Sequence, residues 1–325
     1  MKRVLVSGAS GIVGYGILRS LRQSDKKLFL VGTSIYPDSV APAFCDQFEL
    51  APVTTDSSYI PWLLSMIKKH RIDMLIAGIE ADMYSWVEHR EAIQNAGALP
   101  LLNNSNLIAL CKDKWLFYQT LASANIDCVI TSTLSNDFEM LSAQLGLPFL
   151  LKPRRGFGSK GIVRIHSLQQ FELVKAEVGA ILMAQPIIGT DDEEYTTSAF
   201  CDGMGGYYAR MTLRRTLSKD GFTDKAEVVD STDFDPTLKQ LCSLLKPVGP
   251  TNFQFRKSEG LVKLLEINPR VSSSTAIRTA FGYNENAMAV DFFLEHTPLD
   301  QPKIRRGKAV RYTDEHIFYD DSLYL

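Results

Sequence analysis

Two stretches of the sequence carry residue types that bind phosphate and metal ions. In the first, the apolar run 149–151 ends in Lys152, and a loop rich in arginine and glycine follows at once. Glycine amides can close over phosphate oxygens, and a lysine at a strand end supplies a positioned charge. The pattern therefore predicts a phosphate-binding loop, with a solvated basic hairpin as the alternative. The loop residues assigned to this role are Gly156, Gly158, Ser159 and Gly161.

The second stretch is an expected β-hairpin whose two strands are joined by the turn 257–260. Pairing of these strands brings Gln254 and Glu266 to neighbouring positions on one face. Asn268 lies two residues beyond Glu266 and therefore points to the same side. One carboxylate and two amide oxygens suit Mg²⁺, which takes few protein ligands together with phosphate oxygens. Arg270 projects from the same strand end toward whatever the metal holds, and an ordinary charged surface hairpin is the alternative.

A third pattern is the N-terminal turn that contains Gly8, Gly11 and Gly14. Its G-x-x-G-x-x-G spacing is typical of nucleotide-binding folds, and taken alone it resembles short-chain dehydrogenases and sugar epimerases. An NAD-binding fold needs an acidic residue at the end of its second strand, and residues 30–34 offer none. That family also needs a Tyr-x-x-x-Lys pair, which none of the tyrosines provides. We therefore favour a plain strand–helix turn, with an NAD(P)-binding epimerase or reductase as the alternative.

The elements that must position these residues begin with an alternation of strands and helices. We expect strands over 2–7, 28–32 and 73–77, and helices over 12–23 and 61–70. Such an alternation predicts a parallel sheet with helices on both faces. The first unit is therefore an α/β, Rossmann-like domain.

Two further regions follow and read as a single α+β unit. The region 108–189 contains expected helices over 113–124 and 138–145 and the strand that ends in Lys152. The region 190–325 contains several strands and a late helix. We expect the chain to divide into 1–107, 108–189 and 190–325.

The composition is that of a globular protein. A chain of 325 residues suggests two or three packed units. Lys+Arg number 35 and Asp+Glu 37, which argues against a strongly basic nucleic-acid binder. The 5 cysteines are scattered without a C-x-x-C pair, so reduced thiols are favoured over zinc or disulfides. No signal peptide and no apolar run of about 18 residues is evident, so we expect a cytoplasmic protein without membrane contact.

The ordered set of motifs resembles the ATP-grasp ligases. The set comprises Lys114, Lys152 with its loop, the run 185–189, Glu194 and the run 266–270, and Gln254 precedes the last of these. The segment from 251 to 275 is similar to the large subunit of carbamoyl-phosphate synthase. The resemblance covers nearly the whole chain and implies a pre-ATP-grasp domain, an N-terminal lobe and a C-terminal lobe with an extension.

The resemblance also implies ATP and Mg²⁺, or Mn²⁺, as cofactors. Gln254, Glu266 and Asn268 would hold the metal, and the glycine loop would lie over the phosphates. Gln185 stands where the family usually has an acidic residue and would face the adenine amino group. The residues assigned to ATP are Lys114 and Lys152 at the phosphates, the loop residues Gly156, Gly158, Ser159 and Gly161, Gln185 with the main chain of Pro186 and Ile188 at adenine, and Glu194, or alternatively Glu193, at the ribose.

The implied reaction is a carboxylate–amine ligation through an acyl phosphate. Arg270 and Lys152 are assigned to the transferring phosphoryl group. Arg214 is our candidate for a carboxylate or phosphate contact in catalysis or substrate binding, with a solvated strand edge as the alternative. Glu80 would meet a substrate ammonium, or it is only a helix N-terminal acid. Ser272 would line the acceptor pocket.

Partners other than small molecules are not indicated by the sequence. We expect a carboxylate and an amine as substrates, and a homo-oligomer is compatible with the sequence. The chain has room for one of the two ATP-grasp halves of a carbamoyl-phosphate synthase. A subunit of that kind acting with a partner chain is therefore a further alternative.

Overall fold

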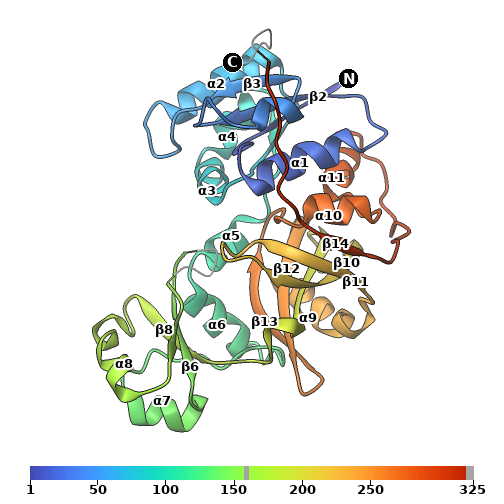
Figure 1. Ribbon diagram of the computed structural model, residues 1–325. Helices are drawn as coiled ribbons and strands as arrows, with labels where there is room; N and C mark the ends of the chain where they lie inside the picture. The colour runs from blue at the N-terminus through green and yellow to red at the C-terminus, as the bar shows by residue number, and fades with distance from the viewer. Residues whose placement is uncertain (157–160, 320–325) are drawn as a thin grey trace.

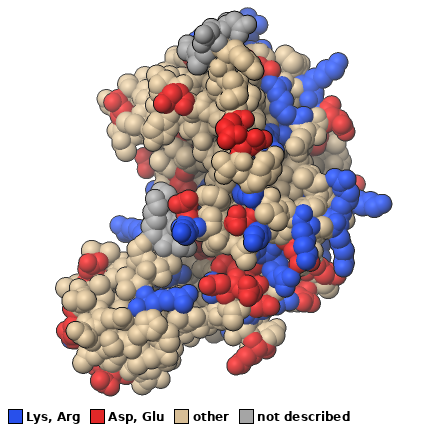
Figure 2. All heavy atoms as spheres, viewed as in Figure 1, with Lys and Arg blue, Asp and Glu red and all other residues tan. Residues whose placement is uncertain are grey.

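The computed structural model describes residues 1–156 and 161–319 of the chain. Figure 1 shows three parts in a row, with the N-terminal unit at one end, a large sheet in the middle and a small lobe at the other end. Figure 2 shows a hollow on one side, between the N-terminal unit and the small lobe. Within the described residues, no helix has both the length and the apolar character needed to cross a membrane.

The N-terminal unit contains a parallel five-stranded sheet in the order β3-β2-β1-β4-β5. This arrangement confirms the predicted α/β unit with a parallel sheet, although β3 and β5 were not predicted. Its strands are β1 (Lys2–Val6), β2 (Leu28–Ser34), β3 (Gln47–Leu50), β4 (Met74–Ile76) and β5 (Leu99–Pro100). Its helices are α1 (Ile12–Arg22), α2 (Tyr59–His70), α3 (Glu80–Glu88) and α4 (Arg90–Asn95).

The two faces of this sheet belong to different cores, because side chains alternate along each strand. Leu5 and Leu75 pack with Leu63 and Trp86 beneath the helices α2 and α3. Val4 and its neighbours on the opposite face share a core with α1 and the large sheet. The N-terminal unit is therefore joined to the next part through apolar packing.

The middle part is a six-stranded antiparallel sheet in the order β13-β12-β9-β10-β11-β14. Its strands are β9 (Glu194–Asp202), β10 (Tyr207–Leu217), β11 (Thr223–Val229), β12 (Val248–Ser258), β13 (Leu261–Asn268) and β14 (Lys308–Val310). Helices cover both faces of this sheet (Figure 1). These helices are α5 (Ser105–Cys111), α6 (Lys114–Ser123), α9 (Asp235–Leu245), α10 (Thr275–Ala280) and α11 (Glu285–Leu294).

The small lobe has a three-stranded antiparallel sheet in the order β7-β6-β8 and a core of its own. Phe149 and Phe171 are fully buried in that core. By contrast, Phe117 and Leu121 of α6 pack in the core of the large sheet, although they precede the small lobe in the chain. The elements of the lobe are α7 (Phe138–Leu145), β6 (Phe149–Pro153), β7 (Val163–Ile165), α8 (Leu168–Glu172) and β8 (Leu182–Pro186).

Candidate functional site

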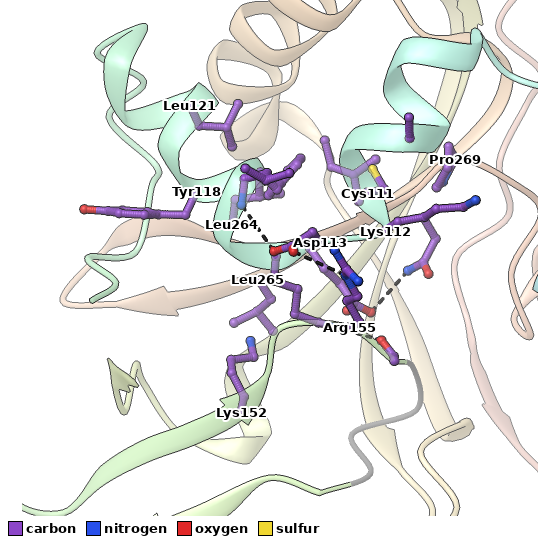
Figure 3. A pocket seen from close by; sticks show the side chains of 18 of the residues that line it. Cys111, Lys112, Asp113, Tyr118, Leu121, Lys152, Arg155, Leu264, Leu265 and Pro269 are labelled. Carbon is purple, nitrogen blue, oxygen red and sulfur yellow. Dashed lines mark hydrogen bonds and ion pairs between the residues drawn. The ribbon is translucent and has the colours of Figure 1, made fainter. Parts of the chain in front are cut away.

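A cavity of about 970 Å³ is lined by residues from the N-terminal unit, the large sheet and the small lobe. A second cavity of about 630 Å³ adjoins it and lies beside α6 and β13. Figure 3 shows Lys152 extending from the small lobe toward this second cavity, with Leu264 and Leu265 on its wall. Both cavities are lined by Lys114, Lys152, Gln185, Glu266 and Asn268. Residues that are far apart in the sequence therefore meet in one place.

The three expected metal ligands lie together in the larger cavity. Gln254 and Glu266 are direct partners in the pairing of β12 with β13. Asn268 donates a hydrogen bond from Nδ2 to Glu266 Oε1 at 3.2 Å. One carboxylate and two amide side chains are ligand types that Mg²⁺ takes together with phosphate oxygens, and here the oxygen of Asn268 accepts from Arg270 while its NH₂ group faces Glu266. Within the described ranges, no group of three His, Cys, Asp or Glu residues offers a different metal site.

Two lysines face this metal set from opposite elements. Lys114 is the first residue of α6, where Asp113 caps the helix by accepting from the backbone N–H of Trp115 at 3.0 Å. Arg154, just after β6, donates to Asp113 Oδ2 at 2.9 Å and so ties the two elements together. Lys152 lies on β6, and Lys114 donates from Nζ to the carbonyl of Gly156 at 2.7 Å.

The protonation of Lys152 is sensitive to its surroundings. Burial in the cavity lowers the pKa of Lys152 to about 8, and nearby Lys114 and Arg256 act in the same direction. Glu266 opposes this shift by favouring the charged ammonium. An added phosphate would favour the ammonium in the same way. Lys152 is therefore suited to hold an anion.

The predicted phosphate loop is only partly described. Gly156 lines both cavities and has a φ of 117°, in the region that favours glycine. Gly161 also has a positive φ, but it does not line either cavity. Gly158 and Ser159 lie outside the described residues.

The expected adenine end of the cavity is formed by β8 and the residues after it. Gln185, Pro186 and Ile188 all line the larger cavity. Gln185 donates from Nε2 to Ser132 Oγ at 2.6 Å. The carbonyl of Ile188 accepts from Arg256 at 3.3 Å. Apolar side chains of Leu150, Ile162 and Leu265 line the same cavity.

Glu194, the expected ribose contact, is buried between two arginines. Its Oε1 accepts from Arg215 at 2.9 Å, and its Oε2 accepts from Arg256 at 3.1 Å. All three side chains line the larger cavity. The alternative residue, Glu193, accepts from the hydroxyl of Tyr195 at 2.7 Å and does not line the cavity. The geometry therefore favours Glu194 over Glu193.

The structure corrects the expectation for Arg214. Arg214 lies on the outer face of β10, where its side chain is 45% exposed and pairs with Glu227 at 2.6 Å. Because side chains alternate along a strand, the next residue, Arg215, points into the cavity instead. Arg215 is 4% exposed. Arg214 thus matches the alternative given for it, a solvated strand edge.

Arg270 and Glu80, expected at the substrate, are paired with each other. The Arg270 guanidinium donates to Glu80 Oε1 at 2.5 and 3.1 Å, and to Asn268 Oδ1 at 3.2 Å. Glu80 begins α3 of the N-terminal unit, so this pair bridges two parts of the molecule. Ser272 is buried beside them, lines the cavity and accepts from Arg278 at 2.8 Å.

The N-terminal glycine turn also reaches the cavity, through Gly11. Its other glycines allow close packing: a Cβ on Gly14 would lie 2.2 Å from the carbonyl oxygen of Gly8. A Cβ on Gly78, which follows β4, would lie 2.1 Å from the carbonyl oxygen of Ser7. These contacts explain the glycines as parts of a tight strand–helix turn, as favoured from the sequence. The lining role of Gly11, like those of Arg215 and Arg256, was not predicted.

One protein family matches the C-terminal part of the chain. It is described as "ATP-grasp in the biosynthetic pathway with Ter operon", and the match covers residues 191–316. The matched segment includes the three expected metal ligands and Arg270.

A curated relative matches nearly the whole chain. The carbamoyl phosphate synthase large chain of Thermotoga neapolitana is 23% identical over an alignment of 354 residues, gaps included. The alignment covers 98% of this chain and 32% of that protein. The chain thus spans about a third of the length of this relative.

Solved structures resemble the fold over most of its length. The N5-carboxyaminoimidazole synthetase from Staphylococcus aureus, complexed with ADP, has a TM-score of 0.70 at 16% identity, covering 93% of this chain and 80% of that chain. An L-amino acid ligase from Bacillus licheniformis has a TM-score of 0.66 at 14% identity, covering 92% of this chain and 75% of that chain. At such low identity, the likeness concerns the fold.

Proposed function

We propose that the chain is an ATP- and Mg²⁺-dependent ligase that joins a carboxylate to an amine, a proposal supported by its match to an ATP-grasp family and by its similarity to the carbamoyl phosphate synthase large chain. The observation that carries the proposal is the meeting of Lys114, Lys152 and Arg270 with Glu266 and the two amide ligands in one cavity. This set combines cations for phosphates with oxygens for a metal. The division into residues 1–107, 108–189 and 190–325 is part of the proposal, as is a cytoplasmic location.

ATP would extend along the larger cavity from β8 to Arg270. Gln185, Pro186 and Ile188 would contact the adenine, and Glu194 would accept from the ribose hydroxyls. Lys114 and Lys152 would contact the phosphates. An ADP complex of a protein with the same fold supports the choice of nucleotide.

The proposed reaction has two steps: the γ-phosphoryl group is transferred to the carboxylate in the first and leaves as phosphate in the second. An oxygen of the substrate carboxylate attacks the γ-phosphorus of ATP, the bond to the β,γ-bridging oxygen breaks, and ADP leaves. The amine nitrogen then attacks the carbonyl carbon, the bond from that carbon to the phosphate oxygen breaks, and the amine nitrogen gives up a proton. The protein must align these groups and balance their charge.

The residues of the cavity divide this work between them. Mg²⁺, held by Gln254, Glu266 and Asn268, would neutralise charge on the phosphate oxygens when bound. Lys152 and Arg270 would balance the charge of the transferring phosphoryl group.

The substrates would bind where the N-terminal unit meets the large sheet. Arg270 offers a guanidinium for a carboxylate, and Glu80 offers a carboxylate for an ammonium. Ser272 lines the same end of the cavity. Arg215, rather than Arg214, is the cation that faces the cavity, and it lies beside Glu194 at the proposed ribose position. A compound with both an acidic and an amino group would complement this end.

An alternative is a subunit that acts with a partner chain, as a carbamoyl-phosphate-synthase-like component. The observation behind it is that the chain spans 32% of the relative's length. Co-purification of a second protein that is required for turnover would favour this alternative. The NAD(P)-binding epimerase or reductase is not favoured, because the N-terminal glycines are explained by tight packing and β2 ends without an acidic residue.

The test is an assay of nucleotide cleavage. Purified protein is incubated with MgATP and a panel of carboxylic acids and amines, and ADP and phosphate are measured. We expect release of ADP and phosphate that depends on both substrates. Release of AMP and pyrophosphate would contradict an acyl phosphate.

Glu266→Gln removes the charge of the metal set and should lower turnover by about a hundredfold or more. Glu259→Gln, at the exposed turn of the same hairpin, is the matched control and should retain activity. A melting temperature close to that of the unaltered protein would show that the Glu266 variant is folded. Full activity in that variant would contradict the metal site.

A further inference from the structure

The segment before α7 holds a serine against Gln185. Thr133 and Ala184 exchange backbone hydrogen bonds at 3.0 and 2.9 Å, which fixes this segment beside β8. Ser132 and Gln185 are the neighbours of these two residues in the chain. Their side chains meet where Gln185 Nε2 donates to Ser132 Oγ at 2.6 Å. The exposed fractions of Ser132 and Gln185 are 5% and 8%, so water has little access to this contact.

The direction of this hydrogen bond is determined by the serine. Ser132 Oγ donates its proton to the carbonyl of Ile130 at 3.1 Å. A hydroxyl has a single proton, so Ser132 can only accept from its other neighbour. The amide of Gln185 must therefore present its NH₂ group to Ser132 and its oxygen away from Ser132. The opposite orientation would place two acceptors against each other in a buried position, which is costly.

The oxygen of Gln185 is consequently available to a ligand. Gln185 lines both cavities, and within the described part of the chain no donor is bonded to its Oε1. Pro186 and Ile188 line the cavity next to it, where the adenine is proposed to lie. An acceptor at this place can bind the 6-amino group of adenine. It would repel the 6-carbonyl oxygen of guanine or hypoxanthine.

We propose that Ser132 is a positioning residue that makes the nucleotide site select ATP over nucleotides with a carbonyl at position 6 of the base. Ser132 acts through Gln185 and need not touch the nucleotide. The inference rests on the proposed ATP site and adds to it the origin of base selectivity. It also explains how glutamine serves where the ATP-grasp ligases usually have an acidic residue. An acid presents an oxygen in either orientation, whereas an amide must be held in one.

The test compares binding of ATP and ITP, which differ at position 6 of the base. Dissociation constants for both are measured with Mg²⁺ by calorimetry, for the unaltered chain and for Ser132→Ala. The alanine removes the acceptor that orients the amide, so the amide can turn its NH₂ group toward the base. We expect the preference for ATP over ITP to fall roughly tenfold, the scale of one hydrogen bond in a buried site. Ser132→Gly is the second variant, for use if the alanine variant does not fold.

The comparison variant is Gln185→Glu, in which both terminal atoms are oxygens and the Ser132 hydroxyl turns its proton from the Ile130 carbonyl to the carboxylate. This variant should keep the preference for ATP, and adding Ser132→Ala to it should leave the preference unchanged. An equal preference in Ser132→Ala and in the unaltered chain would overturn the proposal. The proposal would also be overturned if Gln185→Glu combined with Ser132→Ala lost as much of the preference for ATP over ITP as Ser132→Ala alone. If the unaltered chain binds neither nucleotide, the proposed ATP site itself has failed.

Discussion

The charge of Lys152 changes at mildly alkaline pH. Its pKa is lowered to about 8 by burial, so the ammonium is lost as the pH rises through this value. Phosphate binding needs the ammonium. The affinity for ATP should therefore be steady below about pH 7 and should weaken by up to about tenfold per pH unit above the pKa.

The measurement is the dissociation constant of MgATP between about pH 6.5 and about pH 9.5. Lys152→Arg keeps a charge over this whole range, so its profile should be flat. A profile for the unaltered chain that is equally flat would contradict the role given to Lys152.

Two neighbouring arginines provide a second test at the scale of single residues. Arg215 is buried in the cavity with Glu194, whereas Arg214 is on the outer face of the sheet with Glu227. Arg215→Met should lower the affinity for ATP by about tenfold to a hundredfold, because it removes a cation from the nucleotide site. Arg214→Met should change the affinity less than about twofold.

Binding of MgATP by both variants is the measurement, and a circular dichroism spectrum confirms folding. Equal losses of MgATP affinity in Arg215→Met and Arg214→Met would show that the net charge of the protein, and not the position of Arg215, determines the effect. A conservative Arg215→Lys should restore part of the affinity, because the charge returns without the bidentate geometry.

At the scale of elements, Asp113 connects α6 with β6 and so sets the distance between Lys114 and Lys152. Its side chain caps α6 and pairs with Arg154 at 2.9 Å. Burial alone would raise the pKa of Asp113, but the hydrogen bonds from Arg154 and from the helix amides hold it below the ordinary value. The stabilisation from this charge is therefore present at neutral pH and is lost as the pH falls through the lowered pKa.

Asp113→Ala should lower the free energy of unfolding by about 2 to 4 kcal/mol, since it removes a cap and leaves the charge of Arg154 without its carboxylate partner. Asp137 caps α7, and its carboxylate accepts from the backbone N–H of Met140 at 3.1 Å. Asp137→Ala removes this cap and should lower the free energy of unfolding by about 1 kcal/mol. Urea unfolding measures both. A smaller loss of unfolding free energy for Asp113→Ala than for Asp137→Ala would contradict the role of Asp113 in connecting α6 with β6.

The elements also show what the sequence could and could not predict. Long periodic segments such as α1 and the β12–β13 hairpin were predicted, because their patterns are local. The short edge strands β3 and β5 were not, since four and two residues carry little periodicity. The pairing of Gln254 with Glu266 followed from hairpin register alone. The pairing of Arg270 with Glu80 could not be predicted, because it depends on how two parts of the chain pack.

At the scale of the whole molecule, the N-terminal unit and the large sheet share one apolar core. Ile17 of α1 and Val290 of α11 are fully buried in it together with Phe200 of β9. A fragment of residues 105–325 would expose this apolar surface to water. We expect the fragment to aggregate or to lack a cooperative melting transition, because burial of that surface is a main source of stability.

Circular dichroism and sedimentation of the fragment are the measurements. The full chain, prepared in the same way, is the control. A soluble fragment that melts cooperatively would show that the N-terminal unit is a separable domain.

Because Arg270 is paired with Glu80, a ligand that binds at the substrate end of the cavity must compete with this ion pair. Any anion that comes to Arg270 must displace a carboxylate that is already tethered in place, and a tethered group competes at an effective concentration of roughly millimolar or more. Simple anions that make one contact, such as chloride, compete poorly under these terms. A ligand that supplies a cation for Glu80 together with an anion for Arg270 replaces both sides of the pair at once. The resting protein thus holds its charges in a form that discriminates against partial ligands.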